Sequence, residues 1–315
     1  MTWLPLARLD SSTGVPGLNR NDVYALTVNR PRAGERHKIA QVLNTLDTAI
    51  HDTEAIIAKL KAVKQGLLHD LLTRGIDANG ELRPPQAEAP HLYKASPLGW
   101  IPNDWEASGL AAVAPRDRSV IRTGPFGSSL KGEHWRESGR PVVTIGSLGD
   151  AAFIASELLF VDDSTAARLA EFALIPGDIV FSRVADVGRS VVVLESERGW
   201  IMSSNLMRIS CESAKAQPHF LQMLLSSSVM VRKQLRTTVN SAGRDVANSA
   251  VLMGLCFPWP SPTEQDQILS KARAVSDRLV YEEKDLKKLL DSKIGLMDDL
   301  LTGRVRVTPL LEAAP

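Results

Sequence analysis

The sequence predicts an α+β fold in which one α+β domain lies between two long helices that pack lengthwise on each other. Three observations predict it: an apolar heptad pattern over residues 35–75, a copy of that stretch near the other end of the chain, and short β-rich runs between the two. Apolar residues at alternating third and fourth positions are typical of a helix that pairs with another helix.

The apolar seam of the first helix continues over about four heptads. KLKAVKQGLLHDLLT at residues 59–73 returns as KLLDSKIGLMDDLLT at residues 288–302, an offset of 229 (288 − 59). The offset carries the seam onto the second helix without a gap. The seam residues that we expect at the partner interface are Ile50, Ile57, Leu60, Leu67 and Leu71 in the first helix, and Leu279, Leu286, Leu289, Leu296 and Leu300 in the second.

Polar residues interrupt the seam at equivalent positions of the two copies. Thr53 matches Glu282, and Lys64 matches Lys293. Polar core positions can fix register and partner choice in helix pairs. The alternative is that these side chains lie at the wet edge of the interface, and the sequence does not decide between the two.

Residues 1–34 are turn-rich and too few to fold alone. The same offset places Asn19 on Asn248 and Glu35 on Glu264, so this segment resembles the closing edge of the middle domain. An unrelated N-terminal arm is the alternative interpretation.

The remaining segments follow from periodicity and from proline and glycine. Helices are expected at 164–174, 218–237 and 246–255 inside the middle domain, and strands in runs such as GDIVFSRVA and RSVVVLES. The predicted segments are 35–76 for the first long helix, 77–98 for a proline-rich linker, 99–260 for the middle domain, 261–303 for the second long helix and 304–315 for a short exposed tail.

Composition sets the broad class of the protein. The 315 residues carry a formal net charge of +1, so binding to nucleic acid would need a local basic patch. Only Cys211 and Cys256 occur, which suits a reducing compartment and gives no metal spacing. We see no signal-peptide pattern, and no apolar run approaches ~18 residues. The expected location is the cytoplasm, without membrane association.

A search for catalytic motifs finds little. The sequence has no P-loop, no G-x-S-x-G, no H-E-x-x-H and no Cys/His cluster. The Gly-rich TGPFGSS loop lacks the lysine that follows in a P-loop, and Asp178 and Asp186 have no recognised nuclease spacing. We therefore predict no catalytic residues, no metal site and no enzymatic activity for this chain.

Basic residues gather at three turns of the middle domain, one of them the acid-free window from Val231 to Arg244. Arginine and lysine reach phosphates, while asparagine, serine and bidentate arginine read base edges. A solvated surface explains any one of these residues, but three clusters in one domain favour a DNA-reading surface. The candidate DNA contacts are Lys131, Arg136, Arg183, Arg189, Arg232, Lys233, Arg236, Asn240, Ser241 and Arg244.

These features together resemble the specificity (S) subunit of type I restriction–modification systems. The resemblance covers nearly the whole chain and rests on ERHKIA, on LKAVKQGLLHDLLTRGID and its copy GLMDDLLTGRV, and on the opening LGWIPNDWE. TGPFGSSLK, PGDIVFSR and SNLMRIS add to it. The resemblance implies target recognition domains alternating with conserved helices that pair as an antiparallel coiled coil.

The resemblance also implies partners. Each target recognition domain would read one half of a bipartite double-stranded DNA site, methyltransferase (M) subunits would dock on the helices, and the endonuclease/translocase (R) subunit would join that complex. The S subunit itself would carry no cofactor. S-adenosylmethionine, and ATP and Mg for restriction, would enter through the other subunits.

This chain departs from the two-domain pattern of the family. It has one target recognition domain and the segment 1–34, which indicates a half subunit. It is either a natural half that pairs with a second copy of itself, or the C-terminal part of a disrupted gene. Two other classes stay open: a DNA-binding adaptor of another defence system, and a structural coiled-coil scaffold without a DNA role.

Overall fold

The computed structural model describes residues 17–27, 30–150, 152–241 and 246–312. The fold comprises two compact units. Unit 1 contains residues 1–63 and 275–315, and unit 2 contains residues 64–274. Each long helix therefore contributes one part to unit 1 and the other part to unit 2.

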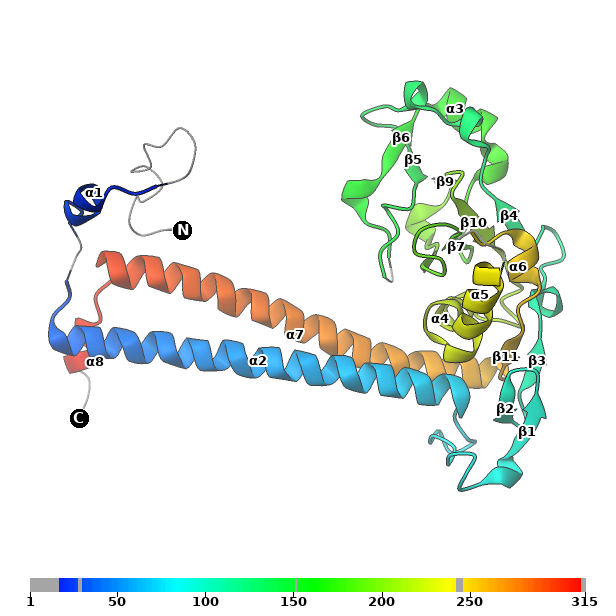
Figure 1. Cartoon of the computed structure of the whole chain (residues 1–315), viewed down its shortest axis with the longest axis horizontal. Coiled ribbons are helices and arrows are strands. Elements are labelled where there is room, and N and C mark those ends of the chain that lie inside the picture. Colours follow the sequence, from blue (N-terminus) through cyan, green and yellow to red (C-terminus); the bar gives the residue numbers. More distant parts are fainter. Residues whose placement is uncertain (1–16, 28–29, 151, 242–245, 313–315) are drawn as a thin grey trace. The chain divides into compact units, whose positions relative to one another are not determined.

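The two long helices begin and end at equivalent positions of the sequence repeat. They are α2, Ala33–Thr73, and α7, Pro262–Thr302, each of 41 residues. Within unit 1 they run antiparallel, because Asp47 on α2 pairs with Lys293 while the later Lys61 pairs with the earlier Glu283. Figure 1 shows the first turns of α2 in blue beside the last turns of α7 in red. The predicted antiparallel pairing of the long helices is confirmed.

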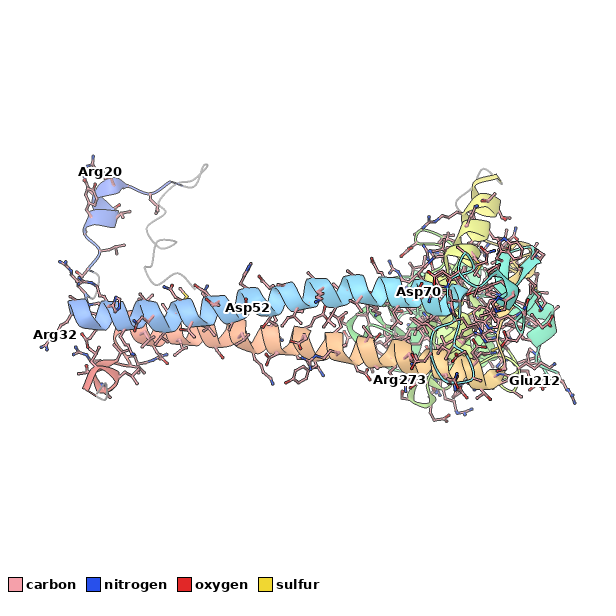
Figure 2. The ribbon with its side chains drawn as sticks, turned by 90° about the horizontal axis from the view of Figure 1, so that it is seen from below. Arg20, Arg32, Asp52, Asp70, Glu212 and Arg273 are labelled. Carbon is pink, nitrogen blue, oxygen red and sulfur yellow. The ribbon has the colours of Figure 1, made fainter. Side chains whose placement is uncertain are left out.

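The apolar seam faces the interior of the helix pair. Every predicted seam position in unit 1 is buried or half-buried. Among the polar ones, Thr53 and Glu282 are buried, whereas Lys293 is half-buried and reaches Asp47. Thr53 donates its hydroxyl to the carbonyl oxygen of Ala49 at 2.8 Å. The first polar pair thus lies in the core, and Lys293 lies at the edge. Figure 2 shows the side chains of the pair, with Arg32 beside the start of α2 and Asp52 along it.

The N-terminal segment carries a short helix that matches one in unit 2. They are α1, Arg20–Tyr24, and α6, Ser249–Met253, which stand at the offset of the repeat. Asn19 caps α1 by accepting from the N–H of Asn21, and Asn248 caps α6 by accepting from the N–H of Val251, both at 2.9 Å. This agrees with a copied segment. Residues 1–16, 28 and 29 of the predicted segment lie outside the described residues.

Unit 2 is built from small sheets. A four-stranded antiparallel sheet has the order β4-β10-β7-β8, a three-stranded sheet has the order β6-β5-β9 with β5 and β9 parallel, and β1-β2 and β11-β3 form antiparallel pairs. The strands are β1 Tyr93–Ser96, β2 Gly99–Pro102, β3 Glu106–Ser108, β4 Ile121–Thr123, β5 Arg140–Val143, β6 Leu159–Val161, β7 Ile179–Ser182, β8 Ser190–Val192, β9 Ile201–Met202, β10 Leu206–Ile209 and β11 Phe257–Trp259.

The core of unit 2 covers both faces of the four-stranded sheet. Ile179 and Phe181 belong to a large cluster with α4 and α5, while Val180 belongs to a second cluster with Val191 and Met202. This explains why the strand in GDIVFSR is continuously apolar instead of alternating. The α+β class predicted from the sequence is confirmed.

One helix predicted at 218–237 is in fact two. Helix α4 is Pro218–Ser227 and helix α5 is Val229–Ser241. Ser228 between them has extended backbone angles, φ −69° and ψ 119°. Its carbonyl oxygen accepts the N–H of Arg232 at 2.9 Å, so Ser228 begins α5 as an N-cap. The predicted helix 164–174 is also shorter: α3 is Asp163–Arg168, followed by a 3₁₀ turn, η7, Ala170–Phe172.

Residues 77–98, predicted as a proline-rich linker, contain a strand and several buried side chains of unit 2. Strand β1 lies in this segment and pairs with β2. Tyr93 is buried and donates its hydroxyl to the carbonyl oxygen of Pro84 at 2.6 Å. Arg83 is buried as well. The prolines are compatible with this structure because Pro84, Pro85, Pro90 and Pro97 all lie outside β1.

The segment 304–315, predicted as a short exposed tail, is exposed at most of its described residues but has one buried anchor and a short helix. Val307 is buried against Ile39 and Leu300 in unit 1, and a short helix, α8, spans Thr308–Glu312. Arg306 donates two hydrogen bonds to Glu35, at 3.0 and 2.7 Å. Among the helices described, none is long and apolar enough to cross a membrane.

Candidate nucleic-acid interface

The predicted basic window lies on helix α5. Lys233 and Arg236 are exposed, and Arg232 is half-buried, with its Nη1 donating to the carbonyl oxygen of Ser226 at 3.3 Å. All three side chains line a hollow of about 330 Å³ beside Val229. No acidic residue lines this hollow, so this face of the helix offers three positive charges.

The turn between β7 and β8 faces the same helix. Ala185, Asp186 and Val187 line a second hollow, of about 220 Å³, together with Arg232 and Arg236 of α5. Ala185 has a positive φ of 61°, a conformation that costs free energy for a residue with a side chain. The two arginines therefore border both hollows.

Two of the predicted DNA contacts are engaged within the protein. Arg189 donates to Asp186 at 3.0 Å and to the carbonyl oxygen of Leu148 at 3.1 Å. Arg136 donates to Asp162 at 2.8 Å. The guanidinium groups of Arg189 and Arg136 are therefore occupied by contacts within the protein.

Lys131 and Asp162 lie in the same region as Arg136. The side chain of Lys131 is exposed, while its backbone N–H donates to Nδ1 of His134 at 2.9 Å. The pKa of Asp162 is lowered, first by the backbone N–H of Thr165 and then by the hydroxyl of Ser164. Asp162 therefore stays charged opposite Arg136 over the whole physiological range.

The largest hollow described in unit 2 surrounds the loop after β4. Its volume is about 1000 Å³, and its walls come from β4, the Gly-rich loop, the α3–η7 segment, the end of β7 and the turn before β10. Arg183, a predicted contact, lines it. Its Nε is buried and has no hydrogen-bond partner among the described residues. Arg122, Arg168 and Asn205 also line this hollow, and none of them is among the DNA contacts predicted from the sequence.

The new cationic residues are positioned by short contacts. Arg122 pairs with Glu171, and its guanidinium lies 5.2 Å from the ring centre of Phe172. Arg168 donates to the carbonyl oxygen of Ser129 at 3.1 Å, which ties α3 to the Gly-rich loop. Three guanidinium groups and one carboxylate thus line the hollow.

A buried cationic group lies beside β4, on the neighbouring strand β10. Arg208 on β10 lies opposite Arg122 in the sheet register and is buried 3.9 Å from Asp178. Asp178 also pairs with Arg118 at 3.1 Å. The pKa of Arg208 is lowered, first by burial and then by the charge of Arg118. Two guanidinium groups share one carboxylate, which leaves a surplus of positive charge at this part of the sheet.

Other chemistry has no support among the described residues. They contain no group of three His, Cys, Asp or Glu side chains able to hold a metal ion. Burial raises the pKa of the Cys211 thiol to about 12, with a smaller contribution from Asp178, so this thiol is a poor nucleophile. Of the remaining predicted DNA contacts, Arg244 and the side chains of Asn240 and Ser241 lie outside the described residues.

Comparison with known proteins gives a consistent result. No protein-family profile matches the chain. The chain is 22% identical over 302 residues to the type I restriction enzyme MjaVIII specificity subunit of Methanocaldococcus jannaschii, and 27% identical over 218 residues to the MjaX specificity subunit of the same organism. The chain is thus similar in sequence to two type I restriction enzyme specificity subunits. The resemblance in the sequence motifs is confirmed.

The fold of a specificity subunit is seen directly in the HsdS subunit from Thermoanaerobacter tengcongensis. That structure matches 96% of this chain with a TM-score of 0.51 at 14% sequence identity, which establishes the shared fold. The chain covers 66% of the length of the MjaVIII subunit, 49% of the MjaX subunit and 66% of the HsdS chain. It thus spans one half to two thirds of the specificity subunits that it matches.

Proposed function

We propose that this chain is a non-catalytic DNA sequence-recognition subunit of a type I restriction–modification complex. Its unit 2 reads one half of a bipartite double-stranded site, and its helix pair holds methyltransferase subunits. The observation that carries the proposal is the hollow at β4, where three guanidinium groups converge on one surface of a chain related to specificity subunits.

The DNA-reading surface combines this hollow with helix α5. Exposed Lys233 and Arg236 suit phosphate contacts, which fix register on the duplex. Arg183 and Asn205 carry the planar groups that read base edges in the major groove. Lys233 and Arg236 therefore contribute mainly to affinity, and Arg183 and Asn205 contribute mainly to sequence specificity.

The helix pair of unit 1 carries exposed apolar side chains for contact with the M subunit. Ile56 and Val63 on α2, and Tyr281 and Ile294 on α7, are exposed although they are large and apolar. They lie outside the buried seam, so helix pairing does not use them. Covering such side chains is a common function of a stable subunit interface.

A second copy of the chain supplies the second reading unit. The equivalent N-caps of α1 and α6, and the equal bounds of α2 and α7 within the repeat, support a design of two similar halves. Two copies related by a two-fold axis would read an interrupted palindrome. Light scattering of the chain with M subunit and DNA should then give two copies per complex, and one copy would contradict the pairing.

The cofactors belong to the other subunits of the complex. Methylation would use S-adenosylmethionine in the M subunit, and restriction would use ATP and Mg through the R subunit. This chain contributes the choice of sequence.

Two measurements test the function. The chain expressed with its M subunit should methylate one interrupted motif, which sequencing of modified bases identifies. Binding of the purified chain to duplex DNA should weaken linearly on a log–log plot as salt rises. A structural scaffold would show neither result, and an adaptor of another defence system would bind DNA without yielding a methylated motif.

A further inference from the structure

Phe126, in the Gly-rich loop after β4, is the most exposed large apolar side chain in the described part of the protein, at 87%. A single exposed apolar residue needs no explanation on its own. The position of Phe126 does need an explanation, because its ring borders the hollow of about 1000 Å³ lined by Arg122, Arg168 and Arg183.

The backbone on the N-terminal side of Phe126 is fixed against the sheet. The N–H of Gly124 donates to the carbonyl oxygen of Leu206 at 3.0 Å. Gly124 also packs so tightly that an added Cβ would overlap the carbonyl oxygen of Ser203. Pro125 is buried and has a restricted φ. The chain therefore enters Phe126 along one defined path.

The C-terminal side is held as well. The carbonyl oxygen of Phe126 accepts the N–H of Ser129 at 2.8 Å, which closes the 3₁₀ turn η4, Gly127–Ser129. The carbonyl oxygen of Ser129 in turn accepts from Arg168 at 3.1 Å. Because both sides are held, the loop presents the ring at the rim of the hollow instead of letting it fold into the core.

The surroundings of the ring define what it contacts. Guanidinium groups attract an anion, Asn205 and the buried, unpaired Nε of Arg183 offer hydrogen bonds, and the Phe126 ring offers a flat apolar face. A nucleotide matches all three, with its phosphate, its base edge and the face of its base. A protein side chain would match one or two of them.

We propose that Phe126 stacks on a nucleobase of the bound DNA and holds that base, or the step beside it, partly out of the helical stack. This inference rests on the proposed DNA-reading function and names the aromatic contact within it. Apolar residues that enter a base step and unstack it are a recurrent device of DNA-binding proteins. The three guanidinium groups then neutralise the phosphates beside the displaced base.

The test uses the full chain and a fluorescein-labelled duplex that the wild-type chain has selected from a random-sequence library. Phe126→Ala should raise the Kd roughly 5- to 150-fold, the range for the loss of one base–aromatic stack. Phe126→Leu, which keeps apolar volume without a ring, should weaken binding similarly, and Phe126→Trp should bind like wild type. Trp100→Ala is the matched control, because Trp100 is an aromatic side chain, 54% exposed on β2, that does not line the hollow.

A spectroscopic readout separates stacking from general affinity. With 2-aminopurine placed at each adenine in turn, wild type and Phe126→Trp should change the fluorescence at one position, and Phe126→Ala should remove that change. The slope of log Kd against log salt should stay the same in all variants, because the phosphate contacts persist. Thermal unfolding of the variants should match wild type, since the ring is exposed.

The outcomes separate the two levels of the proposal. If the wild-type chain selects no duplex, the DNA-reading function itself is wrong. If wild type binds and Phe126→Ala binds equally well, or if Phe126→Leu is indistinguishable from wild type, base stacking is overturned while DNA reading stands. Unchanged DNA binding with weakened M-subunit association would also overturn it, and would place Phe126 in a protein interface.

Discussion

Glu264, near the start of α7, is the residue whose loss should destabilise unit 2 most clearly. Its buried carboxylate accepts hydrogen bonds from Arg83 at 2.5 and 3.2 Å, from the N–H of Ile76 at 2.8 Å and from Nε1 of Trp105 at 3.0 Å. One carboxylate thus joins α7 to the segment that follows α2 and to the indole in the core. Glu264→Ala would leave all three donor groups without this partner.

The magnitude follows from what remains around Arg83. Its side chain is only 9% exposed, and its other carboxylate partner, Asp104, is 61% exposed. Removal of one member of a buried ion pair costs about 3–5 kcal/mol, because the remaining charge stays buried without compensation. The unpaired N–H groups of Ile76 and Trp105 act in the same direction, although such losses are not additive. We expect Glu264→Ala to lower the free energy of unfolding of unit 2 by about 3–5 kcal/mol, a large part of the ~5–15 kcal/mol of a typical domain.

The repeat supplies a matched control. Glu35 is the equivalent residue in unit 1 and accepts from Arg306 and from the hydroxyl of Thr308. The side chain of Arg306 is 60% exposed, so water can replace the lost carboxylate. Glu35→Ala should therefore have a much smaller effect than Glu264→Ala.

Urea unfolding followed by circular dichroism, together with hydrogen exchange at Ile76, measures both changes. Glu264→Gln should fall between wild type and Glu264→Ala, because the amide keeps one acceptor oxygen. If Glu264→Ala and Glu35→Ala shift the urea midpoint equally, burial of the ion pair does not set its contribution, and the reasoning fails.

Four further predictions concern the seam, the DNA surface and pH. Ile57→Asp should break the helix pair, because Ile57 is buried and the new charge would be buried with it. The neighbouring Ile56→Asp should leave helix content and thermal unfolding unchanged, because Ile56 is exposed. Circular dichroism measures both, and equal melting temperatures for the two variants would contradict the seam. Arg183→Ala should weaken binding by ~1–3 kcal/mol and relax one position of the methylated motif, if its guanidinium reads a base; an unchanged motif and Kd would remove it from the surface. Arg236→Ala should weaken binding to all duplexes alike and reduce the salt slope by about 1, and a change in sequence preference would argue against a phosphate contact. Hydrogen bonding from Arg306 lowers the pKa of Glu35, so its stabilising effect is present above the unfolded pKa and is lost as pH falls through the folded pKa; acid titration of wild type and Glu35→Gln should converge at low pH, and a constant difference would refute this.

The elements that the sequence predicts well are those specified by local signals. Heptads, a terminal Gly75 and proline before the second helix locate the long helices to within a few residues of Ala33–Thr73 and Pro262–Thr302. The internal repeat adds a second, independent estimate of the same bounds. Within the middle domain, the break between α4 and α5 at Ser228 was not predicted, because a run of serines is a weak signal inside an otherwise apolar helical pattern.

Residues 77–98 and Val307 show contacts that the sequence does not predict, for a different reason. Prolines argue against helices and central strands, and that inference holds for residues 77–98. It does not follow that such a segment lacks tertiary contacts, since Arg83 is buried and pairs with Glu264, 181 residues away in the sequence. Val307 is buried in the same way by Ile39. Only the fold brings these partners together.

The candidate site shows the same limit at the level of single side chains. A sequence displays the charge of Arg136 and Arg189 but not the carboxylate and carbonyl groups that occupy them. It likewise scatters Arg122, Arg168 and Arg183 over three segments that the fold joins in one hollow. Basic residues that are close together in the sequence therefore predict the basic face of α5, but they do not predict most of the residues that line the hollow at β4.

The net charge of +1 does not describe the local charge of this surface. At a Debye length of ≈ 8 Å in physiological salt, only charges near the hollow act on a phosphate there. Three guanidinium groups and one carboxylate line its wall, and next to β4 Arg118 and Arg208 share the single carboxylate of Asp178. The buried surplus is shielded from counterions, so it contributes to the local potential more than an exposed arginine would. Arg208, opposite Arg122 in the sheet register, adds positive charge beside a wall that already carries three guanidinium groups and the single carboxylate of Glu171.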